Sequence, residues 1–167
     1  AASSSLHAVQ YAYPQTEEAS PSNSYTPTGA TTNVQAVDEG SPSNDGDFIS
    51  TNTGGDAIEF NLTDTLTDPG VDTGHIVRAR AMSDKNGTLM TLGLYEGGSL
   101  IAVSGSLTAN NGSWAPVSFT VPSAAITNYN DLRIRVVASN AGRNRTISVS
   151  WLELEVPDAV VLTAPTV

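Results

Sequence analysis

Apolar and polar residues alternate with a period of two along much of this chain. The pattern is most regular in 130–157, where its first part interleaves basic and apolar positions: Leu132, Arg133, Ile134, Arg135 and Val136. This spacing predicts a strand with one buried and one wet face. A second long strand is expected over 146–157, ending at Pro157, which has no N–H to donate to a ladder. Turn-forming residues at 139–142 predict that the two strands form a hairpin.

The second of these strands changes phase along its length. Its early apolar residues lie at odd positions and its later ones at even positions: Ile147, Val149 and Trp151, then Leu152, Leu154 and Val156. A β-bulge near 150–152 brings both sets onto one face. The alternative is that Trp151 lies on the outer face, against a partner.

Seven further segments have the composition or alternation of strands. They are 31–38, 48–50, 57–62, 74–82, 88–95, 100–103 and 114–121. The segment 100–103 is almost continuously apolar, as in a buried strand. Asn86-Gly87 predicts a hairpin across 83–87, whereas 39–47 and 63–73 are rich in turn residues and are expected to be loops.

These elements predict an all-β protein of about eight to ten strands with short turns. Two packed antiparallel sheets leave few strand edges open, so we expect a two-sheet sandwich of the jelly-roll type. An immunoglobulin-like sandwich is the alternative, although the chain has no cysteine for its Cys-Trp-Cys signature. At 167 residues, a single domain with one core is expected.

The two ends of the chain differ from its centre. Residues 1–30 are rich in Ala, Ser, Thr and Pro, which is typical of an extended arm. We therefore expect an N-terminal arm over 1–30, a sandwich domain over 31–157, and a tail over 158–167. The apolar tail either docks on a neighbour by strand addition or is a flexible remnant. The candidate contact residues of both ends are apolar or aromatic: Val9, Tyr11, Tyr13, Val160, Val161 and Leu162.

The chain is acidic, and its charge is unevenly distributed. The net charge is −10, and residues 1–77 contain eleven acidic and no basic residues. Such a chain offers no basic patch to nucleic acid and is repelled by anionic membranes. The acidic half is expected to be a solubilising surface, with docking on a basic partner as the alternative. Arg133 and Arg135 are expected to pair with acidic residues on an adjacent strand or subunit.

The acidic loop 39–47 and its flank are the candidate for metal chemistry. Asp38, Asp45 and Asp47 supply oxygen ligands that a Ca²⁺ loop can use, but no Glu follows at the offset of an EF-hand. A solvated acidic turn is therefore the favoured interpretation, and no cofactor is expected. The sequence also lacks a Gly-x-Ser-x-Gly motif and paired His ligands for zinc, so we expect no enzymatic activity.

Aromatic residues provide an alternative function. Trp114, Trp151 and five Tyr are residue types on which β-sandwich modules stack sugars. The favoured interpretation is that both Trp side chains fill the core instead.

Seven short sequence segments follow one another over roughly residues 34–157, and their order and spacing carry a resemblance. They are Val37-Asp-Glu39, Asn44-Asp-Gly-Asp-Phe-Ile49, Leu66-Thr-Asp-Pro69, Gly74-His-Ile-Val-Arg-Ala-Arg80, Leu92-Gly-Leu-Tyr-Glu-Gly97, Ile126-Thr-Asn-Tyr-Asn-Asp-Leu-Arg-Ile-Arg135 and Val149-Ser-Trp-Leu-Glu-Leu-Glu-Val-Pro157. Together they resemble a β-sandwich family of tailed-phage virion proteins. The resemblance implies a structural subunit without catalytic residues, such as a capsid decoration or fibre-associated protein.

We therefore expect a non-enzymatic virion protein that is held by its terminal arms on the extracellular particle. Its expected partners are the major capsid protein or other virion proteins, and further copies of itself. Neither nucleic acid nor a membrane is expected as a partner. The alternatives are a carbohydrate-binding β-sandwich module and an extracellular filament subunit assembled by strand addition.

Overall fold

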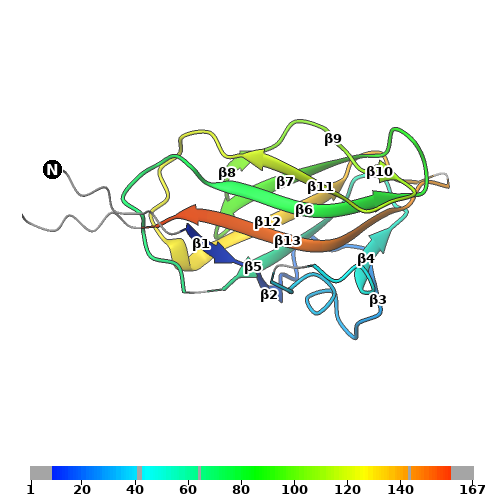
Figure 1. Cartoon of the computed structure of the whole chain (residues 1–167), viewed down its shortest axis with the longest axis horizontal. Coiled ribbons are helices and arrows are strands. Elements are labelled where there is room, and N and C mark those ends of the chain that lie inside the picture. Colours follow the sequence, from blue (N-terminus) through cyan, green and yellow to red (C-terminus); the bar gives the residue numbers. More distant parts are fainter. Residues whose placement is uncertain (1–8, 41–42, 64, 143, 159–167) are drawn as a thin grey trace, which may run out of the picture.

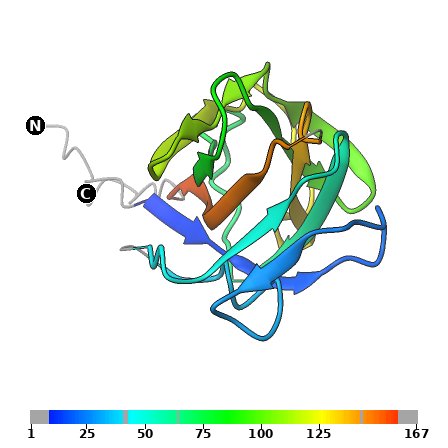
Figure 2. The same ribbon diagram turned by 90° about the vertical axis from the view of Figure 1, so that its right-hand side faces the viewer.

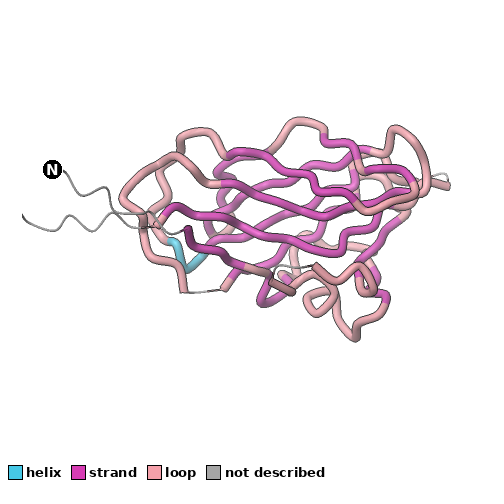
Figure 3. Tube along the Cα trace, in the orientation of Figure 1, coloured by secondary structure: helices cyan, strands magenta, loops and turns pink. Residues whose placement is uncertain are grey.

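The computed structural model describes residues 9–40, 43–63, 65–142 and 144–158. In this part of the chain, thirteen strands form two facing sheets, and a single 3-10 turn, η1 (Tyr129–Asp131), is the one helical element (Figures 1 and 3). The predicted all-β, two-sheet, jelly-roll-like sandwich is confirmed. No helix among these residues is long and apolar enough to span a membrane.

Sheet A has seven strands, of which β6 and β13 are central. It contains β1 (Val9–Ala12), β3 (Thr26–Thr28), β4 (Phe48–Thr51), β6 (Ile76–Ser83), β10 (Asn110–Asn111), β11 (Ala115–Thr120) and β13 (Ile147–Pro157). Its order is β10-β6-β13-β4-β3, with β11 paired to β6 and β1 paired to the end of β13. All pairs are antiparallel except β10 with β6.

Sheet B has six strands and faces sheet A across the core (Figure 2). It contains β2 (Pro14–Glu17), β5 (Asp56–Leu62), β7 (Leu89–Glu96), β8 (Ser99–Val103), β9 (Leu107–Thr108) and β12 (Leu132–Ala138). The order is β2-β5-β12-β7-β8, and β9 also pairs with β7. The strand count exceeds the expected eight to ten because several strands are only two to four residues long.

The core lies between the sheets and follows the predicted alternation. On β12, Ile134 and Val136 are fully buried and face inward. Each such aliphatic side chain contributes about 1.5–3 kcal/mol when it leaves water. On β13 the pairing with β6 shifts between Val149 and Trp151. This β-bulge places Val149 and Leu152 in one core, so the predicted bulge is confirmed, whereas Trp151 lies on the outer face, as the alternative has it.

The two long strands of 130–157 do not form the expected hairpin. β12 lies in sheet B and β13 in sheet A. The expected hairpin at 83–87 is likewise an arch, because it connects β6 in sheet A to β7 in sheet B. Two strands that each have one apolar face can bury it equally well as neighbours in one sheet or as members of two facing sheets. The alternation therefore does not distinguish a hairpin from an arch. Asn140 joins the two arches, since it accepts from Leu89 N at 2.7 Å and donates to Gly87 O at 2.9 Å.

Two expected strands differ in the structure. Residues 31–38 form bends and turns, because local bonds compete with strand pairing: Val37 N donates to Val34 O at 3.0 Å and Gln35 N to the Thr32 hydroxyl at 3.2 Å. β8 forms as expected but is not buried, because it lies at the end of sheet B.

The segment expected to be an N-terminal arm supplies strands to both sheets. β1 pairs with β13, β2 with β5 and β3 with β4. These pairings complete ladders that would otherwise end at open edges. Residues 9–28 therefore belong to the sandwich as much as the residues after position 31 do.

Candidate functional site

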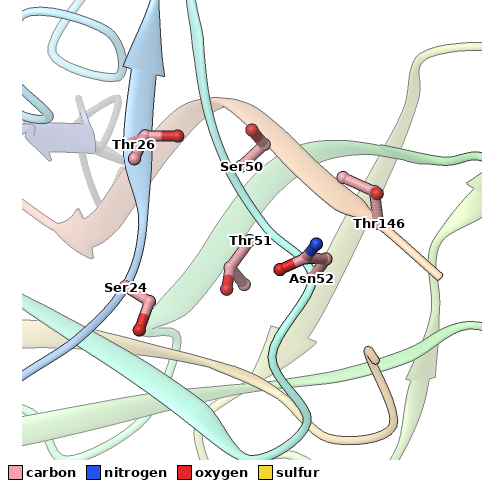
Figure 4. A pocket seen from close by; sticks show the side chains of 6 residues that line it. All are labelled: Ser24, Thr26, Ser50, Thr51, Asn52 and Thr146. Atoms are coloured by element: carbon pink, nitrogen blue, oxygen red, sulfur yellow. The ribbon is translucent and has the colours of Figure 1, made fainter. Parts of the chain in front are cut away.

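A polar pocket lies beside β3 and β4, at one edge of sheet A (Figure 4). Its volume is about 250 Å³. Side chains from three segments line it: Ser24, Thr26, Ser50, Thr51, Asn52 and Thr146. Five of them carry a hydroxyl, one carries an amide, and none is charged. Hydroxyls and amides both donate and accept hydrogen bonds, so this lining suits a neutral polar ligand.

Strand pairing brings the pocket residues together from distant parts of the sequence. Thr26 is the register partner of Ser50, and Thr51 is the partner of Ile147, which follows Thr146. One wall is held by the buried Asp56, whose carboxylate accepts from Ser24 N at 3.1 Å and from the Thr51 hydroxyl at 2.6 Å. The pocket is therefore fixed in shape by the sandwich itself.

The other pocket side chains are not engaged internally. Within the described residues, the side chains of Thr26, Ser50, Asn52 and Thr146 make no hydrogen bond to the protein. Thr26 and Asn52 are exposed, and the other two are half-buried. Their donors and acceptors are available to a ligand.

The outer face of sheet B carries a charge network centred on Glu59. The carboxylate of Glu59 is almost fully buried, and it accepts from Arg135 Nε at 2.7 Å and from Arg133 Nη1 at 3.3 Å. Arg133 also lies 3.3 Å from Glu18. The prediction that the two arginines pair with acid on an adjacent strand is confirmed, because Glu59 belongs to β5, next to β12.

Tyr95 extends this network toward β8. The Arg135 guanidinium lies 4.2 Å from the centre of the Tyr95 ring, a cation–π arrangement. The ring lies over Gly93, where a Cβ would meet Tyr95 Cε2 at 2.9 Å, so a side chain at this position would displace the ring. Charge and aromatic surface on this face thus satisfy each other.

The outer face of sheet A carries a second network. Arg78 bonds Glu153 at 3.1 Å and lies 3.3 Å from Glu155. Arg80 makes a two-point contact with Asp45 at 2.7 and 2.8 Å, and Ser150 donates to the same carboxylate at 2.8 Å. The hydrogen bonds from Arg80, and to a smaller extent the one from Ser150, lower the pKa of the Asp45 carboxyl.

The predicted calcium candidates are separated by these contacts. Asp45 is committed to Arg80, whereas Asp38 and Asp47 lie near Glu39. Burial raises the pKa of Glu39 to about 7, and hydrogen bonding and repulsion from Asp47 add to the rise. In the described part of the chain, no group of three His, Cys, Asp or Glu side chains is placed to hold a metal ion. A solvated acidic turn stays the favoured interpretation of this loop, with Asp38 and Asp47 as the remaining calcium candidates.

Neither tryptophan fills the core, so that expectation is wrong. Trp114 is half-buried and packs at 5.5 Å, between ring centres, against Phe48. Trp151 is the register partner of Arg80 and is half-buried on the outer face of sheet A. Its indole nitrogen is buried without a hydrogen-bond partner among the described residues. Among the described residues, no ring contact joins Trp151 to the Phe48–Trp114 pair.

The candidate contact residues of the N-terminal segment are differently placed. Val9 and Tyr11 lie on β1 and are each 44% exposed, so they are available to a partner. Tyr13 is half-buried, and its hydroxyl donates to Glu153 at 3.0 Å. Val160, Val161 and Leu162 lie outside the described residues. The assembly role of all six side chains stays a prediction.

Sequence reasoning missed the pocket entirely. Its residues are Ser, Thr and Asn, which occur throughout this chain, and they converge only through strand pairing. The available signal was the high density of hydroxyl residues around positions 24–26 and 50–53, of which the first was interpreted as part of an extended arm.

No protein-family model matches the sequence, and no curated protein matches it. Solved structures do match. The C-terminal CBM6 of LamC, a marine laminarinase from Zobellia galactanivorans, is similar with a TM-score of 0.50 and 14% identity, over 88% of this chain and 98% of that chain.

Two other similar structures are also carbohydrate-binding modules by name. A family 16 carbohydrate binding module-2 has a TM-score of 0.45 and 15% identity, over 80% of this chain and 86% of its own. The CBM36-1 domain of a multidomain xylanase from the hindgut metagenome of Trinervitermes trinervoides has a TM-score of 0.45 and 14% identity, over 83% of this chain and 100% of its own. At such identities the LamC likeness shows the fold alone. The comparisons lend no support to the virion resemblance, which stays a prediction.

Proposed function

We propose that this chain is a non-catalytic carbohydrate-binding module that takes a neutral sugar in the pocket beside β3 and β4. The observation that carries the proposal is the pocket lining: five hydroxyls and one amide, without a charged side chain, in a chain of net charge −10. A sugar offers the same mixture of donors and acceptors, so each lining group finds a partner. The likeness to the CBM6 fold is in keeping with the proposal.

The pocket is pre-organised for such a ligand. Asp56 already holds the Thr51 hydroxyl and the Ser24 backbone, so binding does not have to order that wall. Thr26, Ser50, Asn52 and Thr146 supply the contacts to the sugar. No aromatic ring lines the pocket, so stacking does not contribute there.

The expected affinity is low. A neutral hydrogen bond contributes about 0.5–1.5 kcal/mol net, so four of them contribute roughly 2–6 kcal/mol. That range corresponds to dissociation constants from about 30 mM to about 40 μM. Multivalent presentation on a polysaccharide would raise the apparent affinity.

Calorimetric titration against a panel of neutral oligosaccharides tests the proposal. Thr146→Val keeps the shape of the side chain and removes the hydroxyl, and Asn52→Ala removes the amide. Each is expected to weaken binding about fivefold or more, the equivalent of one lost hydrogen bond of about 1 kcal/mol. Thr120→Val, at an exposed position of β11, is the matched control and should bind as the unmodified protein does. Binding that both pocket variants leave unchanged would contradict the proposal.

A structural role on a virion is the second candidate. Val9 and Tyr11 are exposed on β1, where apolar side chains are open to a partner. Val9→Glu should lower the occupancy of the protein on particles without unfolding it. Unaltered occupancy of this variant, measured by quantitative gel analysis of purified particles, would remove the support for that role.

A further inference from the structure

The sheet-edge strands longer than two residues are protected against further pairing, with one exception. β2, β3 and β11 each contain a proline, Pro14, Pro27 and Pro116, which cannot donate to a new neighbour. On β1, the Gln10 side chain donates to Thr67 O at 2.8 Å and accepts from Thr67 N at 2.7 Å, so a loop is fastened to that edge.

β8 has none of these protections. Its sequence, Ser-Leu-Ile-Ala-Val, contains neither proline nor charge. Among the described residues, β8 pairs with β7 alone, so its other edge is open. Leu100 and Val103 are 54% and 52% exposed, more than any other large apolar residue described. A register shift at Ile101 is the single interruption, and it divides the open edge into two short runs.

The segment that contains β8 carries no charge, and the charged neighbours of β8 in the sheet are engaged internally. Glu96, opposite Ser99, accepts from the backbone and hydroxyl of Thr127, and Arg135 is held by Glu59 and Tyr95. Residues 97–130 contain no Asp, Glu, Lys or Arg, although the chain carries a net charge of −10. β8, β9, β10 and β11 all lie within this segment, and β9 contacts β11 of the other sheet. These four strands therefore place uncharged residues along one side of the sandwich, in the upper part of the view in Figure 1.

We propose that this uncharged side is a self-association surface, on which a second copy of the chain docks at the β8 edge and covers Leu100 and Val103. Two copies repel each other because both are acidic, and the repulsion is least where neither carries charge. A basic partner would instead be drawn to the acidic side chains elsewhere. A stable interface buries about 1,200–2,000 Å² in total, so the contact extends from β8 to its neighbours β9 and β11.

The proposal goes beyond sugar binding and is independent of it. β3, at the pocket, and β11 lie at opposite edges of sheet A. A dimer through the β8 side therefore leaves both pockets open, and two pockets on one particle bind a polysaccharide with an avidity that one pocket lacks.

Sedimentation equilibrium over a wide range of protein concentration tests this inference. We expect a monomer–dimer equilibrium that shifts toward dimer as salt screens the net charge. Val103→Glu buries an unpaired charge in the interface and should raise the dimer dissociation constant about tenfold or more. Val71→Glu, at an apolar loop residue that is 40% exposed, is the matched control and should dimerise as before.

Circular dichroism and thermal unfolding of both variants establish that each is folded. A protein that stays monomeric at every concentration and salt level would overturn the inference. A dimer that Val103→Glu leaves intact would overturn it as well. Sugar binding by a strictly monomeric protein would leave the proposed function standing while removing this inference.

Discussion

The outer face of sheet B and the pocket beside β3 and β4 are both polar, but they use their polar groups differently. On sheet B, Glu59 is saturated by two arginines, and one of these also stacks on Tyr95. In the pocket, Thr26, Ser50, Asn52 and Thr146 have no internal hydrogen bonds from their side chains within the described residues. Groups that satisfy one another stabilise the fold, whereas groups left open are available for binding.

The largest expected effect is on the saturated network. Glu59→Ala leaves Arg133 and Arg135 without their shared partner, on a face where the carboxylate was 1% exposed. Because both arginines keep some access to water, we expect a loss of about 3 kcal/mol in the free energy of unfolding. Urea unfolding measures this, and sugar affinity should be unchanged. A loss below about 1 kcal/mol, typical of exposed pairs, would show that the network is not a buried one.

Asp56 is bonded internally and also holds one wall of the pocket, so its replacement should have an intermediate effect on stability. Asp56→Asn weakens the bonds to the Ser24 backbone and the Thr51 hydroxyl. We expect a loss of about 1–2 kcal/mol in stability, together with weaker sugar binding because the pocket wall is no longer held. Calorimetry and unfolding on the same samples measure both. Unchanged sugar affinity despite the loss of stability would show that Asp56 does not support the pocket.

The smallest expected change in the free energy of unfolding comes from Glu39 in the acidic loop 39–47, and it depends on pH. Burial raises the pKa of Glu39 from its ordinary 4.5 to about 7. Between these two pH values, the folded protein therefore holds a proton that the unfolded chain releases. The stabilisation from this proton is complete below pH 4.5 and is lost as the pH rises through about 7. Glu39→Gln imitates the protonated form and should remove that loss.

The difference between the unfolding curves of Glu39→Gln and the unmodified protein isolates this contribution. The variant should be more stable at pH 8 by about 1 kcal/mol or less, since Glu39 is only partly buried. At pH 4 the two proteins should be equally stable. A difference that is the same at both pH values would mean that the pKa of Glu39 is the same in the folded and the unfolded protein.

Alternation along the sequence was sufficient to predict local structure. It identified the inward face of β12, the bulge of β13, and the pairing of Arg133 and Arg135 with acid, because these depend on neighbours in the same strand or the next one. It did not reveal which sheet each strand joins. β12 and β13 each have one apolar face, and that face is buried equally well beside or opposite the other strand.

The functional surfaces were less accessible to sequence reasoning. The apolar run in β8 was interpreted as buried, because a run without alternation does not reveal which of its residues face water. The pocket has no motif at all, since Thr26, Asn52 and Thr146 are brought together by strand pairing alone. Residue types that are common in a chain become a site only through the geometry that gathers them.

An NMR titration of the isotope-labelled protein with neutral oligosaccharides tests the central claim most directly. The account predicts saturable shifts in the amide signals of Thr26, Ser50, Asn52 and Thr146, including the side-chain amide of Asn52. The signals of Glu59 and Tyr95 should not move. Shifts that centre on Tyr95 and leave the pocket signals in place would contradict the account, as would the absence of any shift across a broad panel of sugars.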